Sequence, residues 1–483
     1  MPPSSYPPIL DAANHLGWRE RHAPICQPGI AEPVGAAFPV HALRGSRQRK
    51  PRPDGWPELA LAFLLPVLSF WEVRLLGRLM LSELAIVLAL PCLWLNRRGP
   101  LGRRTRTTLV TGVLWLAFQI GTDVLRETPL VDYARGWAKI AVFLALLTFL
   151  ATLTAGRPAN LLAFGCGLYC GFGLKYFIAP AGLSLAPGAT GFWKFGVGLP
   201  MTGMLVCLSC LKPLRACPSW SQGLLLLVAA ALHLLFGYRS LALVTFATAT
   251  LLALAWRFRC AQRRGRPSRP AAVLLIIGLG IMALWVAYQL ALDTPYAGYS
   301  LREKHDIQSR GRFGLLLGGR SEVLIAIRAI GDSPLMGHGS WAKNRSYALM
   351  EVSQYGVERA EPDPNLGYLI PTHSHLLGAW VEAGVMGALF WARLLCLAFL
   401  CLTRLPKNAD HLLPLAGFAC LDLLWAIPFS PFSFSERLFR AFEVTVMLTQ
   451  LHKPALALPG RLVSSPGRPR VRPVQPVLRP RYG

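Results

Sequence analysis

Two histidines and one glutamate interrupt the apolar stretch PTHSHLLGAWVEAGVMGALFW, residues 371–391. His373 and His375 can each exchange a proton near neutral pH, so either ring could act as a general base. Residues two positions apart on a helix point about 200° away from each other, so the two rings could not bind one metal ion together. Glu382 would lie about 13 Å beyond His373 on such a helix, too far to orient that ring. The spacing therefore favours a site that works without a metal. No cofactor is expected.

Several cations stand in the polar segments between other apolar stretches. Arg135 and Lys139 lie in DYARGWAK, Arg239 lies in FGYRSLAL and Arg320 lies in GGRSE. One arginine at a helix end usually extends toward the lipid–water interface, which is the simplest explanation for each of them alone. Several cations on one face instead indicate an anionic ligand, because guanidinium groups hold phosphate oxygens bidentately and stay charged. The candidate site thus brings together the histidines His373 and His375 and the cations Arg239, Arg320, Arg135 and Lys139, around an anionic substrate.

The elements that must position these residues are apolar and long. Only 15% of the 483 residues are charged, against roughly 25% in a soluble domain. The apolar residues form runs of about 17 to 22, the length that crosses a bilayer as a helix. We therefore predict an all-α polytopic membrane protein with about twelve transmembrane helices. The expected spans are 57–74, 78–95, 108–125, 136–155, 160–180, 194–212, 219–237, 241–257, 271–291, 383–402, 411–429 and 437–451.

The net charge of +26 is unevenly placed along the chain. Basic clusters precede the first span, follow the second and the eighth, and fill the C-terminal tail. With twelve spans these clusters share one side of the membrane, which the positive-inside rule makes cytoplasmic, with both termini there. This topology explains the basic balance, so no nucleic-acid partner is expected. We expect a disordered cytoplasmic segment at 1–56, a transmembrane domain at 57–451 and a disordered basic cytoplasmic tail at 452–483.

One long loop, residues 292–372, joins spans nine and ten on the opposite side of the membrane. It is too long for a connection without secondary structure, so we expect it to fold. The segment SEVLIAIRAI (321–330) repeats apolar residues at helical spacing, and Asp332 and Pro334 follow as stop signals. A second short helix is expected at 344–355.

Three motifs in this chain resemble those of the O-antigen ligase and O-antigen polymerase superfamily. HSHLLGAWVEAGVMG resembles the family signature, with matching positions at His373, Ser374, Leu377, Glu382 and Gly384. GGRSEVLIAIRAIGDSPLMGHGSW resembles the segment that precedes the signature, including its Pro-Leu-x-Gly-x-Gly, and FGYRSLAL resembles the family's Ser-Arg turn. Ser374 stands where Asn is commoner, and Tyr238 stands where Ser is usual. The resemblance covers roughly residues 57–450 and includes the number of spans and the place of the long loop.

The resemblance implies a membrane glycosyltransferase that works at the periplasmic face of the bacterial inner membrane. Such enzymes move a glycan from undecaprenyl diphosphate to an acceptor hydroxyl and use neither a nucleotide sugar nor a metal. Here the arginines would hold the diphosphate, His373 would accept the proton of the acceptor hydroxyl, and His375 would have a supporting role.

The acceptor stays open. A ligase would use lipid A-core, and a polymerase would use another carrier-linked repeat. A transporter or flippase for polysaccharide is the alternative from another class, and it predicts paired ionisable residues near mid-membrane and two related halves. Asp422 is the only obvious buried acid far from an edge, and we find no related halves, so we favour an enzyme.

Overall fold

The computed structural model describes residues 55–74, 77–95, 101–178, 192–211, 219–263, 322–355, 368–407 and 411–452, with five single positions between 282 and 292. These residues belong to one compact unit, Arg52–Gly483, and a second unit, Met1–Pro51, lies outside the described residues. The two expected terminal segments lie almost entirely outside the described residues, as does the ninth expected span, 271–291. Arg320 lies outside them as well.

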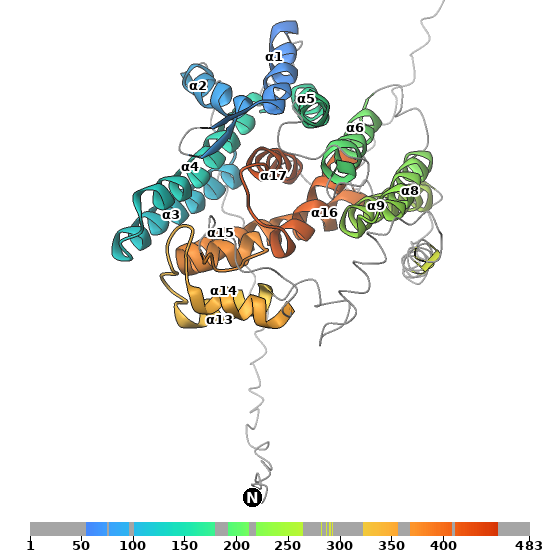
Figure 1. Cartoon of the computed structure of the whole chain (residues 1–483). Coiled ribbons are helices and arrows are strands. Elements are labelled where there is room, and N and C mark those ends of the chain that lie inside the picture. The colour runs from blue at the N-terminus through green and yellow to red at the C-terminus, as the bar shows by residue number, and fades with distance from the viewer. Residues whose placement is uncertain are drawn as a thin grey trace, which may run out of the picture. The chain divides into compact units, whose positions relative to one another are not determined.

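Helices account for about 83% of the structure. Eleven of the expected spans overlap a named helix (Figure 1 labels these helices), and the few described positions of the ninth are helical. The helices are α1 (Trp56–Val67), α2 (Leu81–Leu95), α3 (Arg103–Leu125), α4 (Leu130–Leu153), α5 (Pro158–Ile178), α6 (Leu199–Ser209), α8 (Ser219–Leu235), α9 (Arg239–Arg263), α13 (Glu322–Asp332), α14 (Arg345–Tyr355), α15 (His375–Arg404), α16 (Leu413–Phe429) and α17 (Glu436–His452). Shorter turns are the 3-10 helices η1 (Leu68–Phe70) and η3 (Leu405–Lys407) and the π-helix η2 (Phe192–Gly198).

Five of the described helices, α3, α4, α5, α9 and α15, are long and apolar enough to cross a membrane. Four shorter apolar helices accompany them, at Trp56–Phe70, Leu81–Leu95, Trp220–Leu235 and Leu413–Phe429. The prediction of an all-α membrane protein is therefore confirmed, whereas the count of twelve spans is not. The expected first span is also too long at its end, because α1 and η1 stop at Phe70 and a short strand follows.

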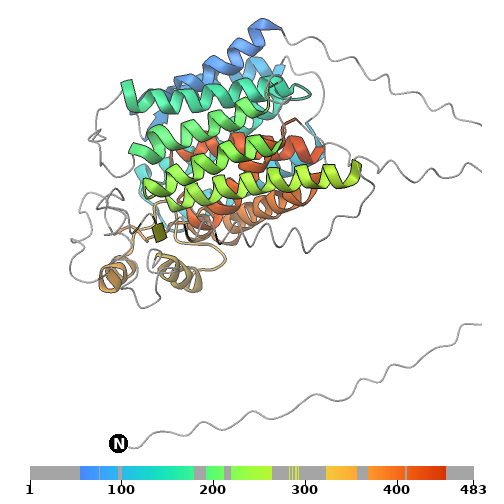
Figure 2. The ribbon, with the colours of Figure 1, turned by 90° about the vertical axis from the view of Figure 1, so that its right-hand side faces the viewer.

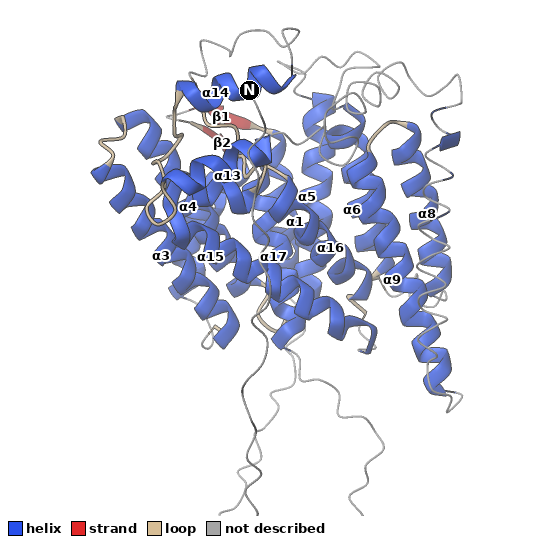
Figure 3. Ribbon diagram, turned by 90° about the horizontal axis from the view of Figure 1, so that it is seen from below, coloured by secondary structure: helices blue, strands red, loops and turns tan. Residues whose placement is uncertain are grey.

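That strand belongs to a small antiparallel hairpin of β1 (Glu72–Arg74) and β2 (Arg78–Met80), seen in red in Figure 3. Glu72 faces Met80, and Arg74 faces Arg78. In the sequence this hairpin is hidden, because its apolar residues continue the runs of the helices on both sides.

The core of the bundle surrounds α17, which Figure 1 shows between the other helices. Every residue from 437 to 448 is buried. Phe439 packs against Phe172 of α5 with ring centroids 4.2 Å apart, and Phe442 lies 5.8 Å from Phe164 of the same helix. α17 also packs against α4, α15 and α16.

Both helices expected in the long loop are present, as α13 and α14, and the prediction is confirmed. Figure 2 shows them at one end of the bundle. Ile325 and Ala329 of α13 pack in one apolar cluster with Val381 of α15. Tyr347 of α14 donates a hydrogen bond to Asp332 at the end of α13. Burial and this bond raise the pKa of Tyr347 to about 12, so at neutral pH the phenol keeps the proton that links the two helices.

Candidate functional site

Helix α15 is broken at Gly384, and the loop after α13 completes it. Gly384 has φ 63° and ψ −156°, a backbone conformation that essentially only glycine adopts. The carbonyls of Val381 and Glu382 accept hydrogen bonds from His338 N at 2.7 Å and Gly339 N at 3.1 Å. Backbone polar groups that lack helical partners must find others inside a membrane protein. The loop supplies these partners, so the break is stabilised by a segment some forty residues earlier in the sequence.

A third hydrogen bond between the two segments has its donor in α15: Val385 N donates to the carbonyl of Leu335 at 3.2 Å. The contact is close because Gly337 has φ +78° and no side chain, and a Cβ there would lie 2.6 Å from Gly384 N. Two of the three motifs behind the family resemblance, Pro-Leu-x-Gly-x-Gly and the histidine signature, thus form one structural unit. The sequence alone did not reveal this pairing.

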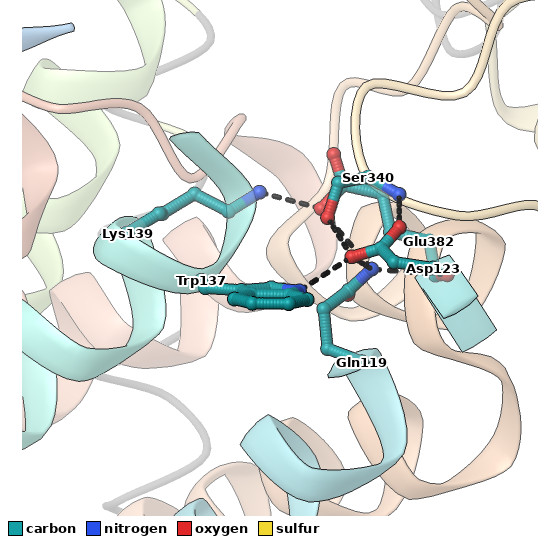
Figure 4. Close-up of polar contacts among 6 residues, drawn as sticks. All are labelled: Gln119, Asp123, Trp137, Lys139, Ser340 and Glu382. Atoms are coloured by element: carbon teal, nitrogen blue, oxygen red, sulfur yellow. Dashed lines mark hydrogen bonds and ion pairs between the residues drawn. The ribbon is translucent and has the colours of Figure 1, made fainter. Parts of the chain in front are cut away.

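An aspartate on α3 holds the same loop from the other side, as Figure 4 shows. Asp123 accepts hydrogen bonds from Ser340 N at 2.6 Å and from Ser340 Oγ at 2.6 Å. Trp137 Nε1 of α4 donates to the same carboxylate at 2.7 Å, and Gln119 Nε2 does so at 3.3 Å. Hydrogen bonds to an ionised acceptor are short and strong, and these compensate the loss of water around a carboxylate that is only 2% exposed.

Gln119, Asp123 and Ser340 were not among the predicted site residues. A signal existed, because Gln119 and Asp123 lie four positions apart within the expected span 108–125. Polar side chains inside a membrane are costly and face an interior partner. Their spacing places them on one helix face, which could have identified the face that binds another segment.

Lys139 and Glu382 form an ion pair between α4 and α15, with Nζ and Oε2 2.5 Å apart (Figure 4). The side chains are 16% and 18% exposed. Lys139 was predicted to bind an anionic substrate, but in this structure its charge is already balanced by Glu382. Glu382, the glutamate of the signature, thus joins α15 to α4. It lies too far along α15 to orient His373.

This ion pair predicts that substitutions at the two positions have strongly coupled effects on the free energy of unfolding. Replacing Glu382 alone by Met is expected to lower the free energy of unfolding by about 3 kcal/mol, because it leaves a mostly buried ammonium without a partner. Replacing Lys139 alone by Met should have a comparable effect. The double variant Lys139→Met/Glu382→Met should recover most of the loss, because neither charge remains. Thermal unfolding of the four purified proteins gives the cycle, and simple additivity of the two losses would contradict the pair.

The two predicted histidines occupy different environments. His373 is exposed in the extended segment just before α15. His375 is 1% exposed, and its ring centroid lies 4.7 Å from that of Trp391 and 5.3 Å from that of Phe432. Its Nδ1 lies 2.5 Å from the carbonyl oxygen of Ser430, so Nδ1 carries a proton and donates it. In this structure His375 has packing contacts and does not reach the surface.

Ser374 fixes the start of α15 between the two histidines. Its backbone is extended and its Oγ accepts a hydrogen bond from Leu377 N at 3.1 Å, which is the N-cap arrangement. The same hydroxyl donates to the carbonyl of Ile427 on α16 at 2.9 Å. His373 is therefore held at a fixed helix start while its ring remains exposed.

The remaining predicted cations lie at element ends. Arg135 of α4 places its guanidinium carbon 5.8 Å from the centre of the Trp341 ring, a cation–π contact with the loop.

Arg239 is the first residue of α9 and is partly buried. Its neighbour Tyr238 lies near Tyr176 of α5, next to Lys175. Lys175 is 5.5 Å from the Phe434 ring, in the α16–α17 connection that also contacts His375. Arg135, Lys139, Arg239 and His373 thus share one end of the bundle.

Buried ion pairs join α16 and α17 near the same end. Arg440 pairs with Asp422 at 2.8 Å and with Glu436 at 2.7 Å, and it also contacts Glu443. Arg437 pairs with Glu83 of α2 at 2.7 Å. The prediction that Asp422 is the only obvious buried acid far from an edge is wrong, because Glu443 near the middle of α17 is buried as well. α17 is enclosed by other helices, so charges within the last expected span are buried.

No protein-family model matches the chain, and no curated protein matches it. Function must therefore be argued from the motif residues and from the geometry of this end of the bundle.

Proposed function

We propose that the chain is a membrane glycosyltransferase of the O-antigen ligase type. The observation that carries the proposal is the pairing of the Pro-Leu-x-Gly-x-Gly loop with the broken helix of the histidine signature. The unit so formed leaves His373 exposed at the start of α15. Arg135 contacts the same loop from α4. A base beside fixed cations, at one end of an apolar bundle, suits transfer from a lipid-linked diphosphate.

In this mechanism the acceptor hydroxyl gives its proton to the neutral imidazole of His373 and its oxygen attacks the anomeric carbon of the glycan. The bond from that carbon to the diphosphate oxygen breaks, and undecaprenyl diphosphate leaves with its negative charge. Arg239, Arg320 and Arg135 hold the diphosphate, where guanidinium groups stabilise the developing charge without a metal or cofactor. Lys139 has a positioning role, because its ion pair with Glu382 joins α4 to α15.

The proposal includes about twelve spans, both termini in the cytoplasm and a reaction at the periplasmic face of the bacterial inner membrane. The product would be lipopolysaccharide or another surface polysaccharide. The acceptor can be tested with a deletion strain. Loss of polymer from lipid A-core with accumulation of carrier-linked chains supports a ligase, and lipid A-core carrying a single repeat supports a polymerase. Unchanged polysaccharide in the deletion strain would exclude both.

A transporter or flippase is the second candidate, and the buried ion pairs of α17 are the observation in its favour. Arg440 lies four residues from the start of α17, about 6 Å along its axis. Its partners Asp422 and Glu443, however, lie near the middle of the 17-residue helices α16 and α17, where a transporter would need paired ionisable residues. Purified protein with donor and acceptor in detergent decides between the two, because only a transferase forms product there.

The proposed diphosphate site predicts that arginine cannot be replaced by lysine. We expect Arg239→Lys and Arg320→Lys each to reduce the transfer rate, with the larger effect at Arg320. Lysine keeps the charge but loses the planar fork. Losing a charge-assisted hydrogen bond of about 1.5–3 kcal/mol corresponds to roughly ten- to a hundred-fold in rate.

Transfer of a diphosphate-linked glycan in membranes, at matched protein level, measures this loss. Arg393→Lys is the matched control, because Arg393 of α15 donates hydrogen bonds to the hydroxyls of Thr107 at 2.6 Å and Thr108 at 3.5 Å, near the start of α3. The control should keep near-normal activity. Near-normal activity of both test variants would mean that these arginines only anchor the helices at the interface.

A further inference from the structure

Helix α13 and the turn after it expose apolar side chains. Ile327 is 54% exposed, and Leu335 and Met336 in the turn are 68% and 40% exposed. The opposite face of α13, with Ile325 and Ala329, is buried against the loop and α15. Exposed apolar residues on one helix and the turn that follows it indicate a binding surface.

The turn lies level with the ends of membrane helices. The carbonyl of Met336 accepts a hydrogen bond of 2.7 Å from Thr122 Oγ1, which lies in the last turn of α3. α3 has 23 residues, a little more than the roughly 20 that cross the hydrocarbon core. Thr122 therefore lies close to the boundary between acyl chains and headgroups, and Met336 lies beside it.

The exposed apolar surface continues onto the membrane helices themselves. The last turn of α3 exposes Val124 and Leu125, at 66% and 67%. Trp380 of α15 donates its indole N–H to the carbonyl of Pro334 at 2.8 Å, and tryptophan is enriched at the membrane–water interface. Arg328 on α13 has a side chain that is 70% exposed and long enough to reach headgroup phosphates while its stem stays apolar.

We infer that α13 and residues 333–337 rest in the lipid leaflet at this end of the bundle, with Ile327, Leu335 and Met336 against acyl chains. The occupant of the surface is lipid, because the same surface continues onto the lipid-facing sides of α3 and α15. An amphipathic helix in this position buries its apolar face at the boundary of headgroups and acyl chains. The inference depends on the membrane character of the chain and not on the proposed transferase activity.

Photocrosslinking in nanodiscs of phosphatidylethanolamine and phosphatidylglycerol tests it on the full-length protein. A p-benzoylphenylalanine residue is placed at position 335 or at position 327, and intact mass spectrometry detects a phospholipid adduct after irradiation. Phe399, exposed in the membrane-spanning part of α15, is the lipid-facing control. Ser346, exposed at the start of α14, is the water-facing control.

We expect phospholipid adducts at 335 and 327 in a yield similar to that at 399, and no adduct at 346. Reaction at 399 but at neither 335 nor 327 would show that the surface faces water and would overturn the inference. A crosslinked dimer through position 335 would overturn it as well, because a second copy would then cover the surface. In the unsubstituted protein, a phospholipid with a diazirine in its acyl chain should label the peptide 322–337, and absence of that label has the same consequence.

Discussion

Replacing His373 by alanine is expected to abolish glycan transfer while the protein still folds and accumulates in the membrane. A positioned general base contributes about 10²- to 10⁴-fold to a rate. The His373 side chain is exposed, so its loss leaves no cavity in the core. The helix start does not depend on the ring either, because Ser374 provides the cap. Transfer of a diphosphate-linked glycan in purified membranes, at matched protein level, measures the effect.

Two controls separate chemistry from folding. His411→Ala changes a histidine between η3 and α16, next to the start of α16, and should keep normal transfer. Ser374→Asn should also be tolerated, because asparagine caps helices as well as serine does. Normal glycan display by His373→Ala would remove this residue from the mechanism, whatever the other cations do.

The helices of this chain follow from local pattern. Apolar runs of bilayer length give α3, α4, α5 and α9, and helical spacing followed by stop residues gives α13. The β1–β2 hairpin could not be predicted, because apolar residues such as Trp71 and Leu79 continue the neighbouring runs. The environment of α17 was not predictable either, since the ion pairs that let its charges be buried come from α2 and α16.

The site was predictable in its components but not in its connections. The sequence singled out Lys139 and Glu382 separately, yet their pairing joins residues 243 positions apart and depends on how α4 packs against α15. It placed His373 and His375 together, but only the α16–α17 connection at Ser430 and Phe432 makes one buried and leaves the other exposed. Asp123 shows that a polar residue inside an expected span can identify where a distant loop binds.

The break in α15 gives the second large expected effect, since Gly384→Ala should release the loop that completes the helix. Alanine at φ 63° and ψ −156° is strained by about 1–3 kcal/mol. A Cβ at this position would also lie 2.0 Å from the carbonyl oxygen of Leu335, which is backbone and cannot turn aside. The loop must move away, and the hydrogen bonds from His338 N and Gly339 N to α15 are lost with it.

Three measurements should therefore change together in Gly384→Ala. The thermal unfolding midpoint falls, residues 333–340 become sensitive to protease, and transfer is lost because the helix that begins at His375 no longer has a fixed partner. Gly121→Ala is the matched control, because Gly121 lies within α3 and a Cβ there would meet nothing within 4 Å. If Gly121→Ala lost stability, protease resistance and transfer as Gly384→Ala does, the bundle would have a general intolerance of added methyl groups. Unchanged protease resistance in Gly384→Ala would mean that the loop does not depend on the broken helix.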